Sequence, residues 1–412
     1  MCQRSRWLAA ALVGLVVFLG AVCHAQYPDL ERLVEGNTTF AFDLYRELVA
    51  DDENLFFSPY SISSALAMAY AGARGETDSQ MADVLHFSLG QEWTHPTFHD
   101  LDRSLMSQER FADNPDSDPF RLNLANSLWG QSGYPLLSDY LSLLENYYGS
   151  ELYEADFVAD PEVARKTINA WVSDETEAKI PELIKQGMIG RATWLVLANA
   201  VYFNAAWQMP FDEDFTEDAP FTTTSGFEVA VPFMHDESHY RYTAGPCYQA
   251  VELAYANSSM AMTIVLPASG AFDAVEAGLD AYGLSEISQS MDRELVSLAL
   301  PKFSFRSAFL LGETLSGMGM PLAFGDDADF SGIDGTDAFF IGNVIHEAFI
   351  AVDERGTEAA AATAVIMAGG APMEPPVPFE FTADRPFLFL IRDTETGTIL
   401  FMGRVMDPSP ID

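Results

Sequence analysis

The sequence predicts an α+β fold. Helical periodicity dominates the first half of the chain, strand-like segments dominate the second, and the two kinds do not alternate as βαβ units would require. The 49% hydrophobic and 12% aromatic residues indicate a large packed core and exclude a disordered chain. Because no internal repeat and no linker divides the sequence, we expect residues 26–412 to form a single domain.

Helices are expected where apolar residues recur at three- and four-residue steps. Pro59 suits the first turn of the second such segment, and the side chain of Ser58 can cap it. The expected helices are 28–50, 60–71, 77–85, 98–108, 137–147, 161–179 and 271–282.

Strands are expected in the apolar segments that lack this period. The segment 194–207 is too apolar for an edge strand and is expected in the middle of a large sheet. Pro301, inside the segment 296–305, indicates an irregularity or an edge. The closing segments 386–391 and 398–405 read as a hairpin, and further strands are expected at 54–58, 120–129 and 339–352, with several short ones in 220–267.

The N-terminus has the features of an export signal. Arg4 and Arg6 precede an apolar run, and a cleavage site before Gln26 would remove residues 1–25 as a signal peptide. The mature protein is then expected to be secreted or periplasmic; a lipid anchor at Cys23 is the alternative. Cleavage would leave Cys247 as a single cysteine, which cannot form an internal disulfide and is expected to be a passive thiol of the core.

The charge of the chain limits its partners. With 61 acidic and 21 basic residues, the net charge of −40 argues against nucleic acid and against heparin-like polyanions. Only Lys166, Lys179, Lys185 and Lys302 are lysines. The N-terminal apolar run is short for a membrane span, so no spanning helix is expected.

No enzyme signature is found. The sequence has no H-E-x-x-H, G-x-S-x-G, phosphate-loop or dinucleotide motif. Ser58 or Ser61 with His346 is the one nucleophile–base pairing to nominate, and both serines are expected to be buried. The cluster of Asp326, Asp327, Asp329 and Asp334 lacks EF-hand spacing and is expected to be an acidic surface turn. We therefore expect neither catalysis nor a metal or other cofactor.

The stretch 346–378 begins as a buried strand and continues as small residues without a period. Thr357, Ala359, Ala361 and Thr363 are small and alternate, as in a strand that must slide between two others and place one face in a packed core. A disordered surface loop is the alternative from composition alone.

Seven segments in order, between about residues 28 and 408, resemble the serpin family, the serine protease inhibitors. They are Asn54-Leu-Phe-Phe-Ser-Pro-Tyr-Ser-Ile62, Asn199-Ala-Val-Tyr-Phe-Asn-Ala-Ala-Trp207, Leu300-Pro-Lys-Phe303, Asp329-Phe-Ser-Gly332, Glu354-x-Gly-Thr-Glu-Ala-Ala-Ala-Ala-Thr363, Ala383-Asp-Arg-Pro-Phe387 and Phe401-Met-Gly-Arg404. Asn204 stands where the family usually has lysine. The fifth segment is similar to the hinge of inhibitory members.

The resemblance implies three β-sheets, eight or nine helices and an exposed reactive-centre loop at about 354–378. It also implies a suicide-substrate mechanism, in which a serine or cysteine protease attacks the loop and forms an acyl-enzyme. The loop then enters the main sheet as a strand and traps the protease in a covalent 1:1 complex. A monomer is expected.

The resemblance further assigns site residues. A shutter of Ser58, Ser61, Asn199 and His346 is expected as a buried hydrogen-bonded cluster. A breach of Trp207, Lys302 and Glu354 marks where insertion starts. The hinge consists of Glu354, Gly356, Thr357, Glu358, Ala359, Ala360, Ala361, Ala362 and Thr363.

The reactive bond is expected at Gly370–Ala371, with Met373–Glu374 as the alternative. No basic residue lies between Arg355 and Arg385, which favours an elastase- or subtilisin-like target over a trypsin-like one. The rival function is a non-inhibitory serpin that acts as a chaperone, carrier or storage protein. The small hinge residues favour inhibition.

Overall fold

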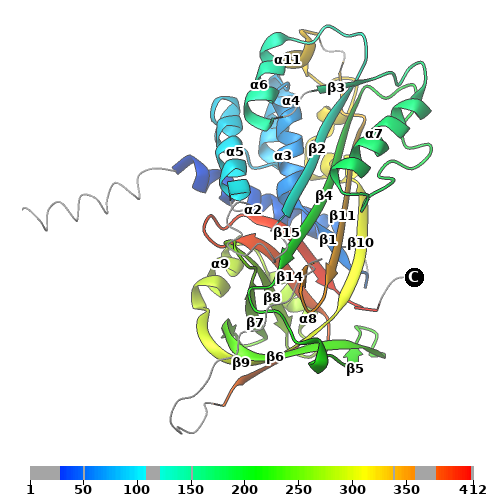
Figure 1. Ribbon diagram of the computed structural model, residues 1–412. Coiled ribbons are helices and arrows are strands. Elements are labelled where there is room, and N and C mark those ends of the chain that lie inside the picture. The colour runs from blue at the N-terminus through cyan, green and yellow to red at the C-terminus, as the bar shows by residue number, and fades with distance from the viewer. Residues whose placement is uncertain are drawn as a thin grey trace, which may run out of the picture.

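Strand β4 (Leu195–Ala206) lies inside a six-stranded sheet of order β10-β11-β12-β4-β2-β3, so the central position predicted for 194–207 is confirmed. The computed structural model describes residues 28–49, 52–107, 121–149, 152–336, 339–357 and 377–409 (Figure 1). The other strands of this sheet are β2 (Arg121–Gln131), β3 (Leu152–Ala155), β10 (Phe303–Leu310), β11 (Asn343–Val352) and β12 (Gly356–Thr357).

The two faces of β4 enter two different cores, which explains why the whole segment is apolar. Val196, Ala198 and Ala200 face a smaller core that includes residues of α7 (Pro161–Glu175). The alternate residues, such as Leu197 and Val201, face the main core under α2 and α3. Successive side chains of a strand point to opposite faces, so a strand covered on both sides carries no polar face.

The second sheet has nine strands. Its path is β1-β15-β14-β8-β7-β6-β9-β13, with β5 paired to β6. The resemblance implied three sheets, but the described residues form two, because the 17-residue strand β6 pairs with β5, β9 and β7 at successive points along its length. The strands are β1 (Leu55–Phe57), β5 (Glu217–Thr222), β6 (Glu228–Ala244), β7 (Tyr248–Ala254), β8 (Met260–Pro267), β9 (Asp292–Pro301), β13 (Phe379–Thr382), β14 (Phe387–Asp393) and β15 (Ile399–Val405).

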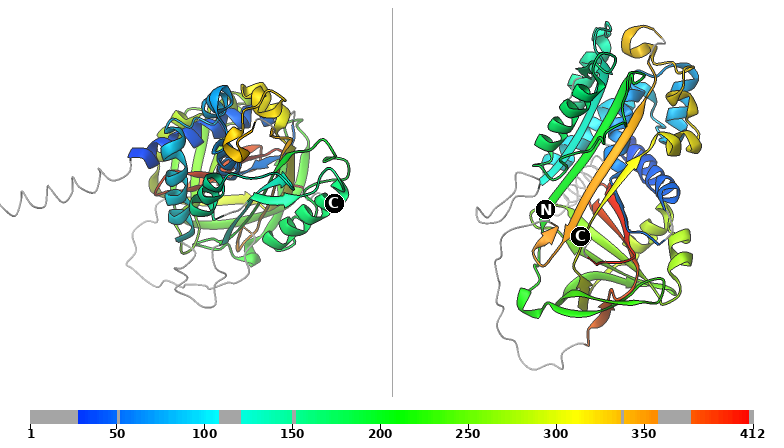
Figure 2. Two further views of the ribbon diagram at one scale, coloured as in Figure 1. Left: turned by 90° about the horizontal axis from the view of Figure 1, so that it is seen from above. Right: turned by 90° about the vertical axis from the view of Figure 1, so that its right-hand side faces the viewer.

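The α+β prediction is confirmed, and helices cover the six-stranded sheet on both faces (Figures 1 and 2). The hydroxyl of Ser58 caps α3, as predicted, by accepting from the Ser61 N–H at 3.2 Å. The described residues form ten α-helices: α2 (Pro28–Leu48), α3 (Pro59–Tyr70), α4 (Gly75–Val84), α5 (Gly90–Met106), α6 (Ser138–Tyr148), α7, α8 (Phe272–Gly278), α9 (Ala281–Ser290), α10 (Gly312–Met318) and α11 (Ser331–Asp334).

Three predicted elements were wrong in extent. The helix expected at 98–108 begins earlier, at Gly90. The helix expected at 271–282 is two helices, because the chain is extended at Leu279 and Asp280 caps α9 through the Gly283 N–H. The strand expected at 296–305 is split between β9 and β10, which belong to different sheets. Pro301 ends β9, and the Lys302 N–H turns to the Pro232 carbonyl. A proline has no N–H with which to extend a ladder.

Within the described part of the chain, no helix is long and apolar enough to cross a membrane. The acidic segment from Asp326 to Asp334 lies at the short helix α11, where Ser331 and Thr336 donate to Asp329 and Asp334. Among the described residues, no group of three or more His, Cys, Asp or Glu is arranged to hold a metal ion.

Candidate functional site

The seam between β4 and β11 is the distinctive feature of the six-stranded sheet. The two strands are parallel and pair directly from Val196↔Asn343 to Val201↔Ala348 (Figure 2). Beyond this point they separate, and β12 lies between them. Thr357 pairs with Ala205 of β4 and with Val352 of β11, antiparallel to both. The seam is therefore closed over six residue pairs and occupied by a third strand at one end.

The two residues of β12 fit this narrow place closely. A Cβ atom on Gly356 would lie 2.2 Å from the Ala205 carbonyl oxygen, so only glycine lets the backbone approach β4. Thr357 is 1% exposed, and its hydroxyl lies 2.7 Å from that of Tyr255, which is also buried. The hinge thus begins as a strand whose side chain already faces the main core.

Trp207 holds the turn that leads into β12. Its indole N–H donates to the Asp353 carbonyl at 3.0 Å, and its backbone N–H donates to the Arg355 carbonyl at 2.9 Å. Its ring stacks on Tyr255 with 4.6 Å between the ring centroids. Trp207 and Tyr255 therefore fix both the turn and the first inserted residue, Thr357.

Glu354 is the charged residue of this turn. Its side chain is 7% exposed; one carboxylate oxygen accepts from Lys302 at 2.7 Å and the other from Thr216 at 2.7 Å. Burial raises the Glu354 pKa, but the hydrogen bonds from Lys302 and Thr216 outweigh it and leave that pKa below its usual range. The three residues proposed for the breach are therefore gathered at the open end of the seam, and the charge of Glu354 is balanced.

The four residues proposed for the shutter also lie together, at the closed part of the seam. The Ser61 hydroxyl accepts from the Asn199 amide at 2.7 Å, and Asn199 accepts from the Nδ1 of His346. All four residues, Ser58, Ser61, Asn199 and His346, are completely buried. Asn199 and His346 are register partners across the seam, so this cluster ties β4 and β11 to each other and to α3.

The hydrogen bonds of His346 define its protonation state. Its Nε2 accepts from the Ser58 backbone N–H at 3.1 Å and therefore carries no proton, which leaves Nδ1–H to donate to Asn199. Burial lowers the His346 pKa to about 3, so the ring is neutral at ordinary pH. The Ser58 hydroxyl donates to the Leu400 carbonyl at 2.6 Å rather than to His346. Neither serine is accessible or aligned as a nucleophile.

Three contributors to this region were missed from the sequence. Asn126 of β2 accepts from Ser61 at 2.8 Å and extends the cluster to a third strand. The same strand also carries Asn123 and Ser127, so Asn126 did not stand out in the sequence. Tyr255 and Thr216 hold Thr357 and Glu354, and neither stands out in the sequence, because each comes from a remote segment.

Other predicted positions lie outside the described residues. These are the expected signal peptide with Cys23, the hinge residues Glu358, Ala359, Ala360, Ala361, Ala362 and Thr363, and both candidate reactive bonds, Gly370–Ala371 and Met373–Glu374. The prediction for Cys247 was wrong. Its thiol is free and exposed, because it lies in the turn that joins β6 to β7 rather than in the core.

Comparisons with known proteins agree on one family. A family model described as serpin (serine protease inhibitor) matches residues 35–408. An uncharacterized serpin-like protein of Thermococcus kodakarensis is 42% identical over 91% of this chain and 86% of its own. The leukocyte elastase inhibitor of Bos taurus is 39% identical over 92% of this chain and 100% of its own.

Solved structures with the same fold include human thyroxine-binding globulin complexed with thyroxine. It superposes with a TM-score of 0.82 at 30% identity, over 92% of this chain and 99% of that one. Uncleaved ovalbumin superposes with a TM-score of 0.81 at 28% identity, over 91% of this chain and 100% of that one.

Proposed function

The chain belongs to the serpin family, and from that premise we propose that it is a secreted inhibitor of serine or cysteine endopeptidases. It acts as a monomer that is cleaved in its reactive-centre loop and traps the protease in a covalent 1:1 complex. The acyl-enzyme forms at Gly370–Ala371, or alternatively at Met373–Glu374. Insertion of the loop between β4 and β11 then carries the protease away before deacylation.

The observation that carries this proposal is the position of β12. An inserted loop must enter between β4 and β11, and Gly356–Thr357 already lies there, buried and antiparallel to both strands. Continuation in the same direction leads along the closed seam toward the shutter. Because β12 is already in register with β4 and β11, the residues that follow it can pair with the next residues of both strands.

The register of β12 predicts where each hinge residue would go. Thr357 pairs with Ala205 and Val352, so a continuing antiparallel strand would bring Thr363 between Asn199 and His346. Insertion would then break the His346–Asn199 hydrogen bond, and the hydroxyl of Thr363 could pair with the two freed groups. Ala359 and Ala361 would face the main core on the same side as Thr357, where only small side chains fit between packed strands.

The exchange is favourable because two ladders replace one. Entry of the loop breaks six direct pairs between β4 and β11 and forms antiparallel pairs with both strands. At roughly 0.5–1.5 kcal/mol net for each added hydrogen bond, a further ten bonds would sum to about 10 kcal/mol. This free energy is available only after cleavage frees the loop at one end.

An elastase-like target is proposed on two grounds. Trypsin-like proteases require a basic residue at the cleaved bond, and the segment between Arg355 and Arg385 contains none. The bovine relative is named a leukocyte elastase inhibitor. The second candidate, a non-inhibitory carrier, is suggested by thyroxine-binding globulin, which was solved with thyroxine. The small residues of the hinge favour the inhibitor.

The test is incubation of the mature protein with an elastase-like serine protease. We expect a complex that survives SDS, and release of a C-terminal peptide whose mass identifies the reactive bond. Cleavage that yields no complex and no gain in thermal stability would favour the non-inhibitory function.

A further inference from the structure

Three arginines and one glutamate form an unusual row across the nine-stranded sheet. Arg293 of β9 and Arg241 of β6 are direct cross-strand partners, and Arg241 is in turn the partner of Glu252 on β7. The buried Glu252 carboxylate accepts from Arg241 at 3.0 Å and from Arg392 at 2.6 Å. Like charges directly opposite each other destabilise a sheet. Here the Glu252 carboxylate pairs with both Arg241 and Arg392, and Arg293 lies beside Arg241 as a third arginine.

Arg293 is the member without a protein partner. In the ranges that the structure describes, its guanidinium forms no hydrogen bond and no ion pair, whereas Arg241 also donates to the Ser288 carbonyl at 2.7 Å. Three guanidinium groups against the single Glu252 carboxylate leave two formal positive charges in this row, in a chain of net charge −40. Asp292 and Glu294 flank Arg293 in β9, but neither of them lines the cavity beside this row.

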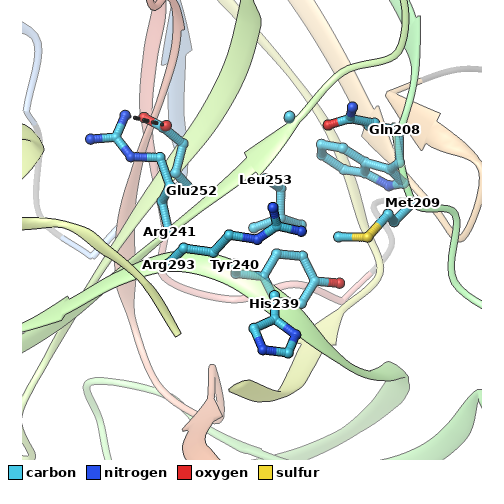
Figure 3. Close-up of a pocket in the computed structure, with 10 residues that line it drawn as sticks. Gln208, Met209, His239, Tyr240, Arg241, Glu252, Leu253 and Arg293 are labelled. Carbon is cyan, nitrogen blue, oxygen red and sulfur yellow. Dashed lines mark hydrogen bonds and ion pairs between the residues drawn. The ribbon is translucent and has the colours of Figure 1, made fainter. Parts of the chain in front are cut away.

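The row borders a cavity of about 520 Å³. Figure 3 shows the Arg293 side chain crossing it between Leu253 and Tyr240, with His239 at one edge. Trp207, Met209 and Ala254 add apolar groups to the wall, and Gln208 and Glu252 are its other polar members. The cavity therefore combines fixed positive charge with a wall suited to an apolar body, as in sites for small organic ligands.

We propose that this cavity binds a small organic anion with an apolar or aromatic body. The acidic head, a sulfonate or carboxylate, accepts hydrogen bonds from the guanidinium N–H groups of Arg293, and Arg241 and His239 lie beside it. A guanidinium group matches such heads because it can donate two parallel hydrogen bonds. The apolar body lies against Tyr240, Leu253 and the indole of Trp207.

The ligand would touch the site proposed for inhibition. Trp207 is one of the residues that line this cavity, and it also donates to the Asp353 and Arg355 carbonyls before β12. An occupant that packs on the indole stabilises this arrangement. Resting on the proposed function, we expect a bound anion to change the rate of loop insertion, because insertion continues from β12 and this turn fixes the position of β12.

The probe for the binding site is 8-anilinonaphthalene-1-sulfonate, an aromatic sulfonate that fluoresces when bound. We expect saturable binding to the full chain. Loss of one charge-assisted contact in Arg293→Ala should weaken it about tenfold. Arg293→Lys keeps the charge and should recover part of the affinity. Arg191→Ala removes an exposed arginine outside this cavity and should leave the affinity unchanged.

A second measurement localises the probe. Phenylglyoxal modifies accessible arginines, and peptide mass spectrometry reports each one. The sulfonate should protect Arg293 and leave Arg191 reactive. Equal affinity in wild type and Arg293→Ala, or unprotected Arg293, would overturn the site. Because Arg293 is exposed, the variant should keep the wild-type thermal midpoint, which excludes misfolding as the cause.

The regulatory consequence is measured separately, as the rate of protease complex formation with and without the probe. Wild type should change and Arg293→Ala should not. If the probe binds at Arg293 but neither protein ever forms a complex, the proposed function fails while the site stands. If complexes form but the probe does not bind there, only the site fails.

Discussion

The two ends of the β4–β11 seam are stabilised in different ways. At the breach a third strand is already present, and polar or charged contacts from four remote segments surround it, including a lysine whose side chain is 36% exposed. At the shutter the strands touch directly, and every group is buried, neutral and hydrogen-bonded. The first arrangement is partly exposed on its lysine side, whereas opening of the second would leave buried hydrogen-bonding groups without partners.

If the loop inserts as proposed, the two ends would control insertion differently. The Lys302–Glu354 pair is exposed on the lysine side, and partly exposed pairs contribute little to stability, so we expect the breach to yield at small cost. A buried polar group that loses its partner costs considerably more, so we expect the shutter to keep the seam closed until an incoming residue supplies a substitute. Thr363 is the residue that the register predicts for this role.

Thr357→Arg should have the largest effect. Thr357 is 1% exposed and faces the main core, so an arginine there must either stay out of the seam or bury its charge at a cost of several kcal/mol. We expect the variant to be cleaved as a substrate, with at least about a tenfold increase in the stoichiometry of inhibition. Thr167→Arg, on the exposed side of α7, is the control and should inhibit normally. Full trapping by Thr357→Arg would refute insertion at β12.

His346→Ala should weaken the closed end of the seam. The substitution leaves the Ser58 N–H and Asn199 amide oxygen without their partner and opens a cavity. We expect a loss of about 3 kcal/mol in the free energy of unfolding, together with faster spontaneous conversion to an inactive form. Chemical denaturation and activity decay at 37 °C measure the two effects. The exposed His239→Ala is the control; similar losses in both variants would remove the special role of the shutter.

Some features of the fold and of the seam could be predicted from the sequence, and others could not. The central position of β4 and the meeting of His346 with Asn199 could be expected, because an apolar run identifies β4 and family motifs identify the two residues. The partners Tyr255 and Thr216 could not, since a hydroxyl 102 residues from Thr357 leaves no local pattern. Cys247 was misjudged because a free thiol reads as apolar, whereas its turn between β6 and β7 places it outside the core. The division of the expected strand 296–305 into β9 and β10 was predicted only as an irregularity at Pro301.

The pH dependence of stability should report on His346. Its pKa is about 3 in the folded protein and near 6.5 in an unfolded chain, so the unfolded state binds more protons below that value. The contribution is therefore present above pH 6.5 and declines as the pH falls toward 3, by up to about 1.4 kcal/mol per pH unit. His95, whose pKa burial lowers to about 4, acts in the same direction. The difference between wild type and His346→Gln isolates His346, and identical slopes would contradict its burial as a neutral ring.

Lys302→Met should have the smallest effect. The ion pair with Glu354 is partly exposed on the lysine side, and Thr216 keeps one hydrogen bond to the carboxylate. We expect a decrease of under about 1 kcal/mol in stability, measured by urea denaturation, with inhibition retained. Lys166→Met, from an exposed pair on α7, provides the comparison. A loss as large as that of His346→Ala would mean that the breach, not the shutter, keeps the seam closed.

The most direct test of loop insertion is to lock the seam reversibly. Ala198 and Ile345 are register partners on β4 and β11, and both are buried on the face toward α7. Adjacent strands lie about 4.8 Å apart, within the Cα separation that a disulfide spans. In a Cys247→Ser background, the oxidised Ala198→Cys/Ile345→Cys protein should be cleaved by the protease without forming an SDS-stable complex. Reduction should restore the complex, and each single-cysteine variant should trap throughout. Undiminished trapping by the oxidised protein would show that the loop does not enter between β4 and β11.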